Sequence, residues 1–317
     1  MLKEKFFLPN NFLGIPEEYT QYKSSEFLIL PISYEQTTSF VKGTKDGPKA
    51  IIDASQQVEF YDGEIGFEPY KEGIYTFPEL EPTVSYPQEM VRRIYQVAKK
   101  ISGEFKSKLS APEKILISLG GEHTITLGLV KAFKEKYKNL SVLQLDAHAD
   151  LRDSYQDSKY SHACVMRRIY QFCSYVGVGI RSISLEESRF AQKNKIRLFM
   201  AEGMKDNKSW MDQVIGLLSE EVYLTLDLDF FDPSIMPAVG TPEPGGFLWD
   251  ETLKFLKKLS LKKKIVGFDM VELCPLPGNV VSDFLAAKLI YKIMGYILRG
   301  EEERFHGTKK RTKRKRE

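Results

Sequence analysis

Cysteine is scarce in this 317-residue sequence, and long apolar runs are missing. Cys164, Cys173 and Cys274 are widely spaced and form no Cys-x-x-Cys pair, which argues against a disulfide framework or a thiolate zinc site. No apolar stretch approaches the roughly 18–20 residues that span a bilayer. The first ten residues also lack the apolar segment of a secretory signal. We therefore expect a cytoplasmic protein without a membrane partner.

A general excess of basic charge is also missing. The formal net charge of +3 depends on the last ten residues, which hold seven Lys or Arg and one Glu and so carry +6. The preceding 307 residues carry −3, whereas a nucleic-acid-binding domain should have its basic patch on the fold itself. Like charges at a terminus are usually solvated. We predict one folded domain over residues 1–305 and a basic, disordered tail over 306–317. Binding of a polyanion by this tail is the non-enzymatic alternative.

Short apolar segments alternate with longer amphipathic segments along the chain. The short segments predict strands at 27–32, 115–118, 142–145, 175–179, 196–199, 222–228 and 265–268. The longer segments predict helices at 48–60, 87–105, 124–137, 162–172, 209–218, 250–259 and 283–298. Strands that alternate with helices of this length form right-handed βαβ units. The pattern predicts an α/β fold with three α/β/α layers and a mostly parallel central sheet.

Polar side chains follow several of the predicted strands at the point where each strand ends. Gly120-Gly-Glu-His123 follows one strand, and Asp146-Ala-His-Ala-Asp150 follows the next. Asp227-Leu-Asp229 and Glu272 come at the ends of two later strands. Ligands of open parallel sheets bind beyond the carboxyl ends of the strands. These segments should therefore meet at one edge of the sheet.

The aspartates and histidines of these segments indicate a metal site. Asp146, His148 and Asp150 are spaced by two, so on extended backbone their side chains point the same way, and Asp227 and Asp229 repeat this spacing. Carboxylates gathered in a pocket repel one another and take up protons unless a cation holds them. A lone Asp-x-His-x-Asp is often a solvated loop, but a second Asp-x-Asp and a Gly-Gly-Glu-His segment favour a metal.

The number of candidate ligands exceeds the three or four that one zinc ion takes. Four aspartates and two histidines suit two ions that prefer oxygen and imidazole ligands, such as Mn²⁺. Two divalent ions about 3.5–4 Å apart activate water as a nucleophile at neutral pH. The carboxylates leave such a site slightly negative, which favours a cationic substrate.

These motifs, in this order, resemble the signatures of the ureohydrolase family of arginases, agmatinases and formiminoglutamases. The resemblance extends from about residue 27 to residue 298. It rests on segments 30–33 with 43–48, 120–124, 146–150, 227–233 with 240–246, and 269–272. Glu122 and Thr124 stand where the family more often has Asp and Ser. The resemblance implies the arginase/deacetylase-like fold and a catalytic domain over residues 1–305. A deacetylase-type hydrolase with one metal ion shares this fold class but needs fewer ligands.

The resemblance also implies a ligand set and residue roles. Two Mn²⁺, or other divalent ions, would be held by His123, Asp146, His148, Asp150, Asp227 and Asp229, with Asp146 and Asp227 bridging. His162 would transfer a proton to the leaving amine, and Glu272 would pair with the guanidinium group of the substrate. Thr241 would contact the substrate. Alternatively, His162 is a histidine at the start of a helix and Glu272 is a glutamate at the end of a strand, and neither has a catalytic role.

Within the family, the sequence looks most like agmatinases of the prokaryotic type. It lacks the Asn in the loop 151–155, and the acid after the strand ending at Gly179, that hold the amino-acid end of arginine. The implied reaction is hydrolysis of agmatine, a small cationic guanidine, to putrescine and urea in polyamine biosynthesis. The implied assembly is a homo-oligomer, a trimer or hexamer. Aminopropylagmatine, arginine, formiminoglutamate and guanidinobutyrate are alternative substrates, and Arg152 or Arg181 would bind the carboxylate of a guanidino acid.

Overall fold

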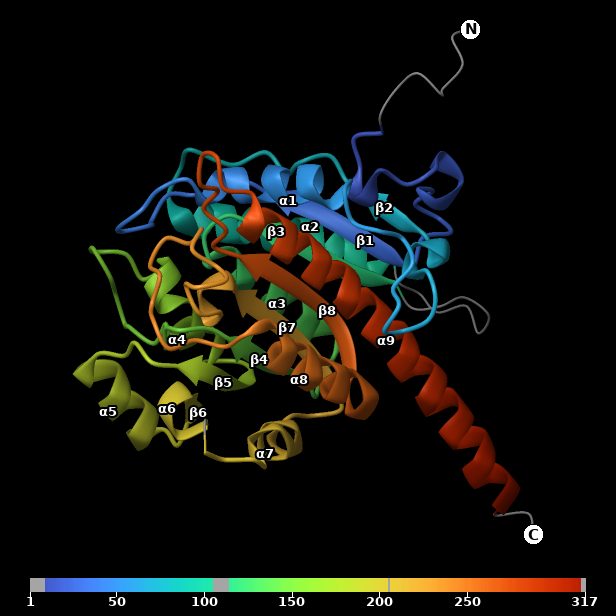
Figure 1. Ribbon diagram of the computed structural model, residues 1–317. Coiled ribbons are helices and arrows are strands. Elements are labelled where there is room, and N and C mark those ends of the chain that lie inside the picture. Colours follow the sequence, from blue (N-terminus) through green and yellow to red (C-terminus); the bar gives the residue numbers. More distant parts are fainter. Residues whose placement is uncertain (1–8, 105–113, 205, 315–317) are drawn as a thin grey trace, which may run out of the picture.

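A parallel β-sheet forms the centre of the structure. The computed structural model describes residues 9–104, 114–204 and 206–314, without the side chains of 305–314 (Figure 1). The eight strands lie in the order β2-β1-β3-β8-β7-β4-β5-β6, and every neighbouring pair is parallel. Their bounds are β1 Phe27–Ile32, β2 Ile74–Thr76, β3 Ile115–Gly120, β4 Ser141–Leu145, β5 Ser174–Ile180, β6 Arg197–Met200, β7 Glu221–Asp227 and β8 Lys264–Val271. The predicted fold class is confirmed, and the sheet is parallel throughout.

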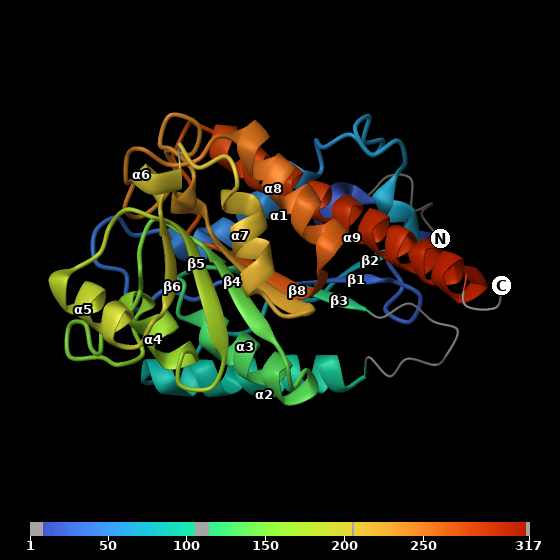
Figure 2. The ribbon, with the colours of Figure 1, turned by 90° about the horizontal axis from the view of Figure 1, so that it is seen from below.

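Helices cover both faces of the sheet (Figure 2). One hydrophobic core joins a face of the sheet to α1, α7, α8 and α9, and a second joins the other face to α2, α3 and α4. The helices are α1 Gly47–Ser55, α2 Pro87–Gly103, α3 Ile125–Lys136, α4 Val165–Ile169, α5 Leu185–Lys193, α6 Ala201–Met204, α7 Trp210–Leu217, α8 Trp249–Lys262 and α9 Val281–Arg314. All residues of β1, β3 and β4 are buried, as their unbroken apolar sequences require when both faces are covered.

Several elements differ from the sequence-based expectation. The strand β2 was not predicted. It has only three residues, at the edge of the sheet beside β1, which are too few to show an alternating pattern. The helices α5 and α6 were not predicted. The expected helix 162–172 is a 3₁₀ turn, His162–Cys164, followed by the short α4. Phe105, the expected end of the second helix, lies outside the described residues.

The last helix is longer than expected. α9 passes its predicted end at Leu298, and its backbone remains helical to Arg314, within the basic segment. Lys and Arg have good helix propensity, so their sequence does not oppose this continuation. The division into a domain over 1–305 and a tail over 306–317 stays a prediction. None of the helices in the described parts of the chain has the length and hydropathy of a membrane span.

The four central strands of the sheet deliver the polar segments to one edge. β3, β8, β7 and β4 are neighbours, and each is followed by one of the predicted motifs. The segment after β3 lies between the extensions of β1 and β8. The N–H of Gly121 donates to Ile32 O at 3.0 Å, and the N–H of Glu272 donates to Gly121 O at 2.8 Å. A Cβ atom on Gly121 would lie 2.1 Å from Tyr34 O, so only glycine permits this close backbone approach.

Gly121→Ala should therefore destabilise the fold. The new methyl group must displace backbone, and we expect the free energy of unfolding to fall by about 1–3 kcal/mol. Urea denaturation followed by circular dichroism measures this change. Gly216→Ala, in α7 where a Cβ meets no other atom within 4 Å, is the matched control and should be neutral or slightly stabilising. Equal stability of both variants would contradict the packing argument.

Candidate metal centre

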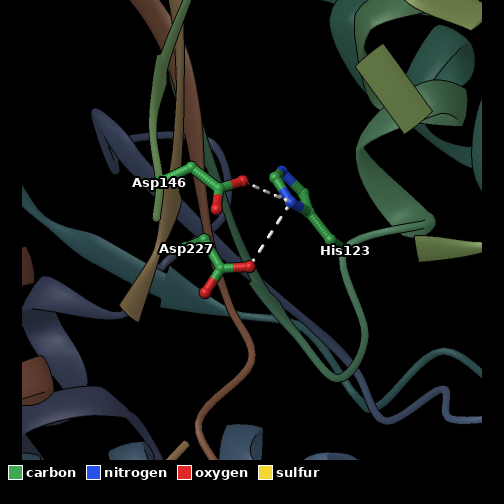
Figure 3. Close-up of side chains that lie close together, drawn as sticks. All are labelled: His123, Asp146 and Asp227. Carbon is green, nitrogen blue, oxygen red and sulfur yellow. Dashed lines mark ion pairs between the residues drawn. The ribbon is translucent and has the colours of Figure 1, made fainter. Parts of the chain in front are cut away.

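A buried histidine and three aspartates form the first part of the centre. His123 follows β3, Asp146 follows β4, and Asp227 is the last residue of β7; their side chains point toward one another (Figure 3). His123 Nδ1 lies 3.2 Å from Asp146 Oδ2, 3.4 Å from Asp227 Oδ2 and 3.0 Å from Asp150 Oδ2. Three segments that are far apart in sequence therefore supply one set of candidate ligand atoms.

A second group of candidate ligands shares Asp146 with the first. His148 Nδ1 lies 2.8 Å from Asp229 Oδ2 and 3.7 Å from Asp146 Oδ1. Asp146, His148 and Asp229 each offer an atom within 4.8 Å of the others, as do His123, Asp146 and Asp227. The two oxygens of Asp146 face the two different imidazoles. This placement suits a carboxylate that bridges two ions, whereas Asp227 belongs to the first group only.

The backbone beneath these side chains is not uniformly extended, contrary to the sequence-based argument. Asp150 has φ = 53°, in the left-handed region, and Asp229 lies in a 3₁₀ turn, Leu228–Phe230. Side-chain oxygens shape both loops, because Asp146 Oδ1 accepts from the N–H of His148 at 2.6 Å and Asp227 Oδ1 accepts from that of Asp229 at 3.0 Å. The side chains converge, but through turns and not through strand alternation.

Burial perturbs the titration of the whole cluster. Desolvation and repulsion from Asp150 and Asp229 raise the pKa of Asp146 to about 7, and desolvation raises the pKa of Asp227 well above its ordinary value. Burial opposes a charge on His148, but the carboxylate of Asp229 raises the pKa of this imidazole to about 11. Burial likewise opposes a charge on Asp229, yet His148 lowers its pKa to about 2. The cluster thus favours bound cations, whether protons or metal ions.

The hydrogen bonds of His123 leave one ring nitrogen for a ligand. Nε2 lies 2.8 Å from Thr225 Oγ1, and the Thr225 hydroxyl donates to Asp269 Oδ1 at 2.7 Å. Because the single hydroxyl proton goes to Asp269, Thr225 accepts the Nε2 proton. Nδ1 is buried and has no hydrogen-bond partner among the described residues, although it faces three carboxylates. Such a fixed nitrogen among oxygen donors fits a divalent metal ion.

Comparison with known proteins places this geometry in a family. Residues 25–295 match the model of the Arginase family. The chain belongs to the arginase family. It is 39% identical over 306 residues to N(1)-aminopropylagmatine ureohydrolase of Synechocystis, covering 93% of this chain and 98% of that protein. It is 34% identical to agmatinase of Pyrococcus horikoshii, covering 86% and 92%. The motif-based resemblance is confirmed.

The solved structures agree with the sequence comparisons. The crystal structure of agmatine ureohydrolase of Thermoplasma volcanium has a TM-score of 0.82 and 30% sequence identity, covering 94% of this chain and 98% of that one. The arginase-family fold therefore extends over nearly the whole chain, which explains why the family's motifs occur in order along the sequence.

A cavity of about 220 Å³ opens onto the candidate ligands. Glu272, His162 and Thr241 also line it. Glu272 is buried with φ = 66°, and its Oε1 accepts from the N–H of His123 at 2.7 Å. Thr241 Oγ1 lies 3.5 Å from Asp229 Oδ2. All nine predicted site residues thus lie in or around one arginase-family cavity, and their individual roles stay predictions.

The cavity wall includes residues that the sequence analysis did not select. Thr38–Val41, Tyr155 and Ser182 contribute to it, and Arg152 lies with its guanidinium 5.2 Å from the ring centre of Tyr155. Of these residues, only Arg152 was predicted from the sequence, as a possible partner for the carboxylate of a guanidino acid. The others follow strands β1 and β5 or belong to a long loop, without a motif to mark them.

Arg181 does not lie where a substrate carboxylate would need it. Its guanidinium donates to backbone carbonyl oxygens on both sides of the candidate centre and is missing from the cavity wall. The acceptors are Gly179, Asp229, Phe230, Phe231, Glu243 and Pro244. The side chain of Arg181 therefore fixes the loop that carries Asp229, and only Arg152 is left to bind a carboxylate in the cavity.

Metal affinity should depend on pH in this arginase-family protein. Without metal, the raised pKa values of His123 and His148 keep both imidazoles protonated at neutral pH, and a metal ion must displace these protons. Apparent Mn²⁺ affinity should thus fall as pH falls from 9 to 7, by about tenfold per pH unit for each proton displaced. Calorimetry in buffers of different ionisation enthalpy counts the released protons. An affinity that is independent of pH would contradict this assignment.

Proposed function

We propose that this protein is a dinuclear-metal hydrolase that releases urea from a cationic guanidine. The observation that carries the proposal is the pair of His/Asp clusters that share Asp146, beside a cavity lined by the other five candidate ligands and Glu272. The reaction adds one water across the guanidinium carbon and gives urea and a primary amine. Membership of the arginase family supports this reaction class.

Two Mn²⁺ ions are the proposed cofactors. His123, Asp146, Asp150 and Asp227 would hold one ion, and Asp146, His148 and Asp229 would hold the other, with Asp227 as the second bridging ligand that the family resemblance implies. When bound, the ions supply a water activated as nucleophile and neutralise carboxylate charge. Oxygen ligands with two imidazoles favour Mn²⁺ over ions that select thiolates. The buried Nδ1 of His123 supports this ligand set.

Glu272 is the proposed partner of the guanidinium. Its Oε1 is fixed by the N–H of His123, which leaves Oε2 for the substrate. Burial raises the pKa of Glu272 well above its ordinary value, so a carboxylate there is costly unless a cation binds it. A guanidinium provides both that charge and paired N–H donors. The contact would orient the carbon toward the nucleophile.

His162 and Thr241 are the remaining proposed active-site residues. The departing nitrogen must gain a proton, and the imidazole of His162 in the cavity wall is placed to transfer one. The hydroxyl of Thr241 would contact the substrate near Asp229. We assign no role in turnover to the basic segment 306–317.

The favoured substrate is N(1)-aminopropylagmatine, with agmatine as the second candidate. Relatives from Synechocystis and from Thermus thermophilus, at 39% and 35% identity, are named for the aminopropyl compound. The relative from Pyrococcus horikoshii is named an agmatinase, and that name supports the second candidate. Either substrate places the protein in polyamine biosynthesis. We further propose a cytoplasmic homo-oligomer.

Product release from a panel of amidino compounds tests the substrate, with urea measured for the guanidines and formamide for formiminoglutamate. The Mn²⁺-loaded protein should act on aminopropylagmatine and agmatine with kcat/KM at least tenfold above that for arginine, formiminoglutamate or guanidinobutyrate. Neither favoured compound carries a carboxylate, and Arg181 is not free to bind one. Arg152→Ala should lower any residual activity on guanidinobutyrate selectively. Preference for a guanidino acid in the unaltered protein would overturn the proposal while leaving the metal centre intact.

Glu272→Gln separates substrate binding from metal binding. This variant should retain both metal ions, because Gln keeps an oxygen for the N–H of His123, yet lose about 10²–10⁴-fold in kcat/KM. Asp229→Ala should instead lose metal, measured by elemental analysis after dialysis. Asp212→Ala, an exposed aspartate paired with Lys258, is the control and should change neither quantity. Equal metal loss in Glu272→Gln and Asp229→Ala would contradict the role of Glu272.

A further inference from the structure

The hydroxyl of Thr37 lies between a buried carboxylate and the imidazole of His162. Thr37 Oγ1 donates to Glu122 Oε1 at 2.7 Å, and it lies 3.2 Å from His162 Nδ1. The same oxygen accepts from the backbone N–H of His162 at 3.1 Å. These three residues come from the loop after β1, the motif after β3 and the start of a 3₁₀ turn. Neither Thr37 nor Glu122 lines the cavity.

The hydrogen bonds of the Thr37 hydroxyl determine which ring nitrogen of His162 carries the proton. A hydroxyl has one proton to donate and two lone pairs that accept. The proton of Thr37 goes to Glu122, so both lone pairs are left for His162. The backbone N–H occupies one, and the other must accept from Nδ1–H. Nε2 is then the unprotonated nitrogen, and no described residue hydrogen-bonds to it.

Both carboxylate oxygens of Glu122 accept hydrogen bonds from neighbouring donors. Its Oε2 accepts from the backbone N–H groups of Gln36 and Thr37, both at 2.6 Å. Its Oε1 accepts from the Thr124 hydroxyl at 2.6 Å as well as from Thr37. The side chain is fully buried. Oε1 thus has the Thr124 and Thr37 hydroxyls as its two donors, and the shorter contact of Thr37 Oγ1, 2.7 Å to Glu122 against 3.2 Å to His162 Nδ1, directs the Thr37 proton to Glu122.

One neighbouring group competes with this arrangement. Ser161 Oγ lies 3.3 Å from His162 Nδ1, and its own proton could be donated to that nitrogen. Such a bond would place the ring proton on Nε2. The Thr37 contact is slightly shorter and belongs to a hydroxyl whose proton is already committed, so the structure favours Nδ1–H.

We infer that Thr37 and Glu122 are positioning residues that fix His162 in its Nδ1–H tautomer and leave Nε2 free to accept a proton in the cavity. The tautomer follows from the contacts alone. Its consequence for turnover rests on the proposed function, in which Nε2 takes up a proton released by the water that adds to the carbon and passes this proton to the leaving amine. Glu122, Thr37 and His162 form a carboxylate–hydroxyl–imidazole chain, and of the three only His162 lines the cavity.

Thr37→Val tests the inference, because it removes the hydroxyl and keeps the shape. Thr37→Ser restores the hydroxyl, and Ser161→Ala removes the competing donor. Thr252→Val is the matched control, since Thr252 is also buried and donates a hydrogen bond, to Leu248 O in α8. Long-range ¹H–¹⁵N spectra of the Mg²⁺-loaded protein at alkaline pH report the tautomer. The chain has four histidines, and the spectrum of His162→Asn identifies the signals of His162.

The unaltered protein and Ser161→Ala should show Nδ1–H, whereas Thr37→Val should show a shift toward Nε2–H. With Mn²⁺ and the preferred guanidine, Thr37→Val should lose about 10–100-fold in kcat with KM within about twofold, and Thr37→Ser should recover most of it. Nε2–H in the unaltered protein, or an unchanged tautomer in Thr37→Val, would overturn the inference. So would a shifted tautomer with normal kcat, or an equal loss in Thr252→Val. A protein without guanidine hydrolysis would refute the proposed function, while the spectra would still decide the tautomer.

Discussion

Repulsion among buried carboxylates is the constraint on which the rest of the site depends. Four aspartates and Glu272 gather in a region from which water is largely excluded, and their charges cannot coexist there without cations. The fold creates this situation because β3, β8, β7 and β4 are neighbours whose carboxyl ends open at the same edge. Two imidazoles relieve part of the repulsion. Divalent ions and a cationic substrate would relieve the remainder, so the proposed cofactor and the proposed substrate class have one electrostatic origin.

A second layer of contacts holds this unfavourable arrangement in place. Arg181 binds the carbonyl oxygens of the loop that carries Asp229. Asp150 and Glu272 adopt left-handed φ angles that are uncommon for residues other than glycine. Such strain persists where surrounding contacts over-determine the backbone, and here the N–H groups of Met166 and Arg167 both donate to Asp150 O. The geometry of the candidate centre therefore depends on contacts made by Arg181, Met166 and Arg167, which lie outside the cavity wall.

The sequence predicted the layers and the candidate ligands because both leave local signals. Alternating segments indicate a parallel sheet, and motifs at strand ends mark its active edge. Thr225 has a weaker local signal: it precedes Asp227 by two residues and therefore lies on the same face of β7. α5 likewise begins with a capping box, Ser184 and Glu187, that a search for helix starts would have found. The bond from Thr37 to Glu122 spans 85 residues and depends on how β1 and β3 pair, which no local pattern encodes.

Substrate choice depends on a different part of the molecule from the chemistry. In the proposed function, the buried end of the cavity meets only the amidino group that every candidate substrate contains. The outer wall is built by loops, with Phe40 73% exposed and Arg152 stacked on Tyr155. A positive charge on this wall favours a distal carboxylate and repels a distal ammonium, whereas the Thr38–Val41 segment presents hydroxyl and apolar groups. For the proposed polyamine substrates, this charge distribution favours an exit of the chain on the side of Thr38–Val41. Family membership fixes the reaction at one end of the cavity, and the position of these loops selects the molecule that enters from the other.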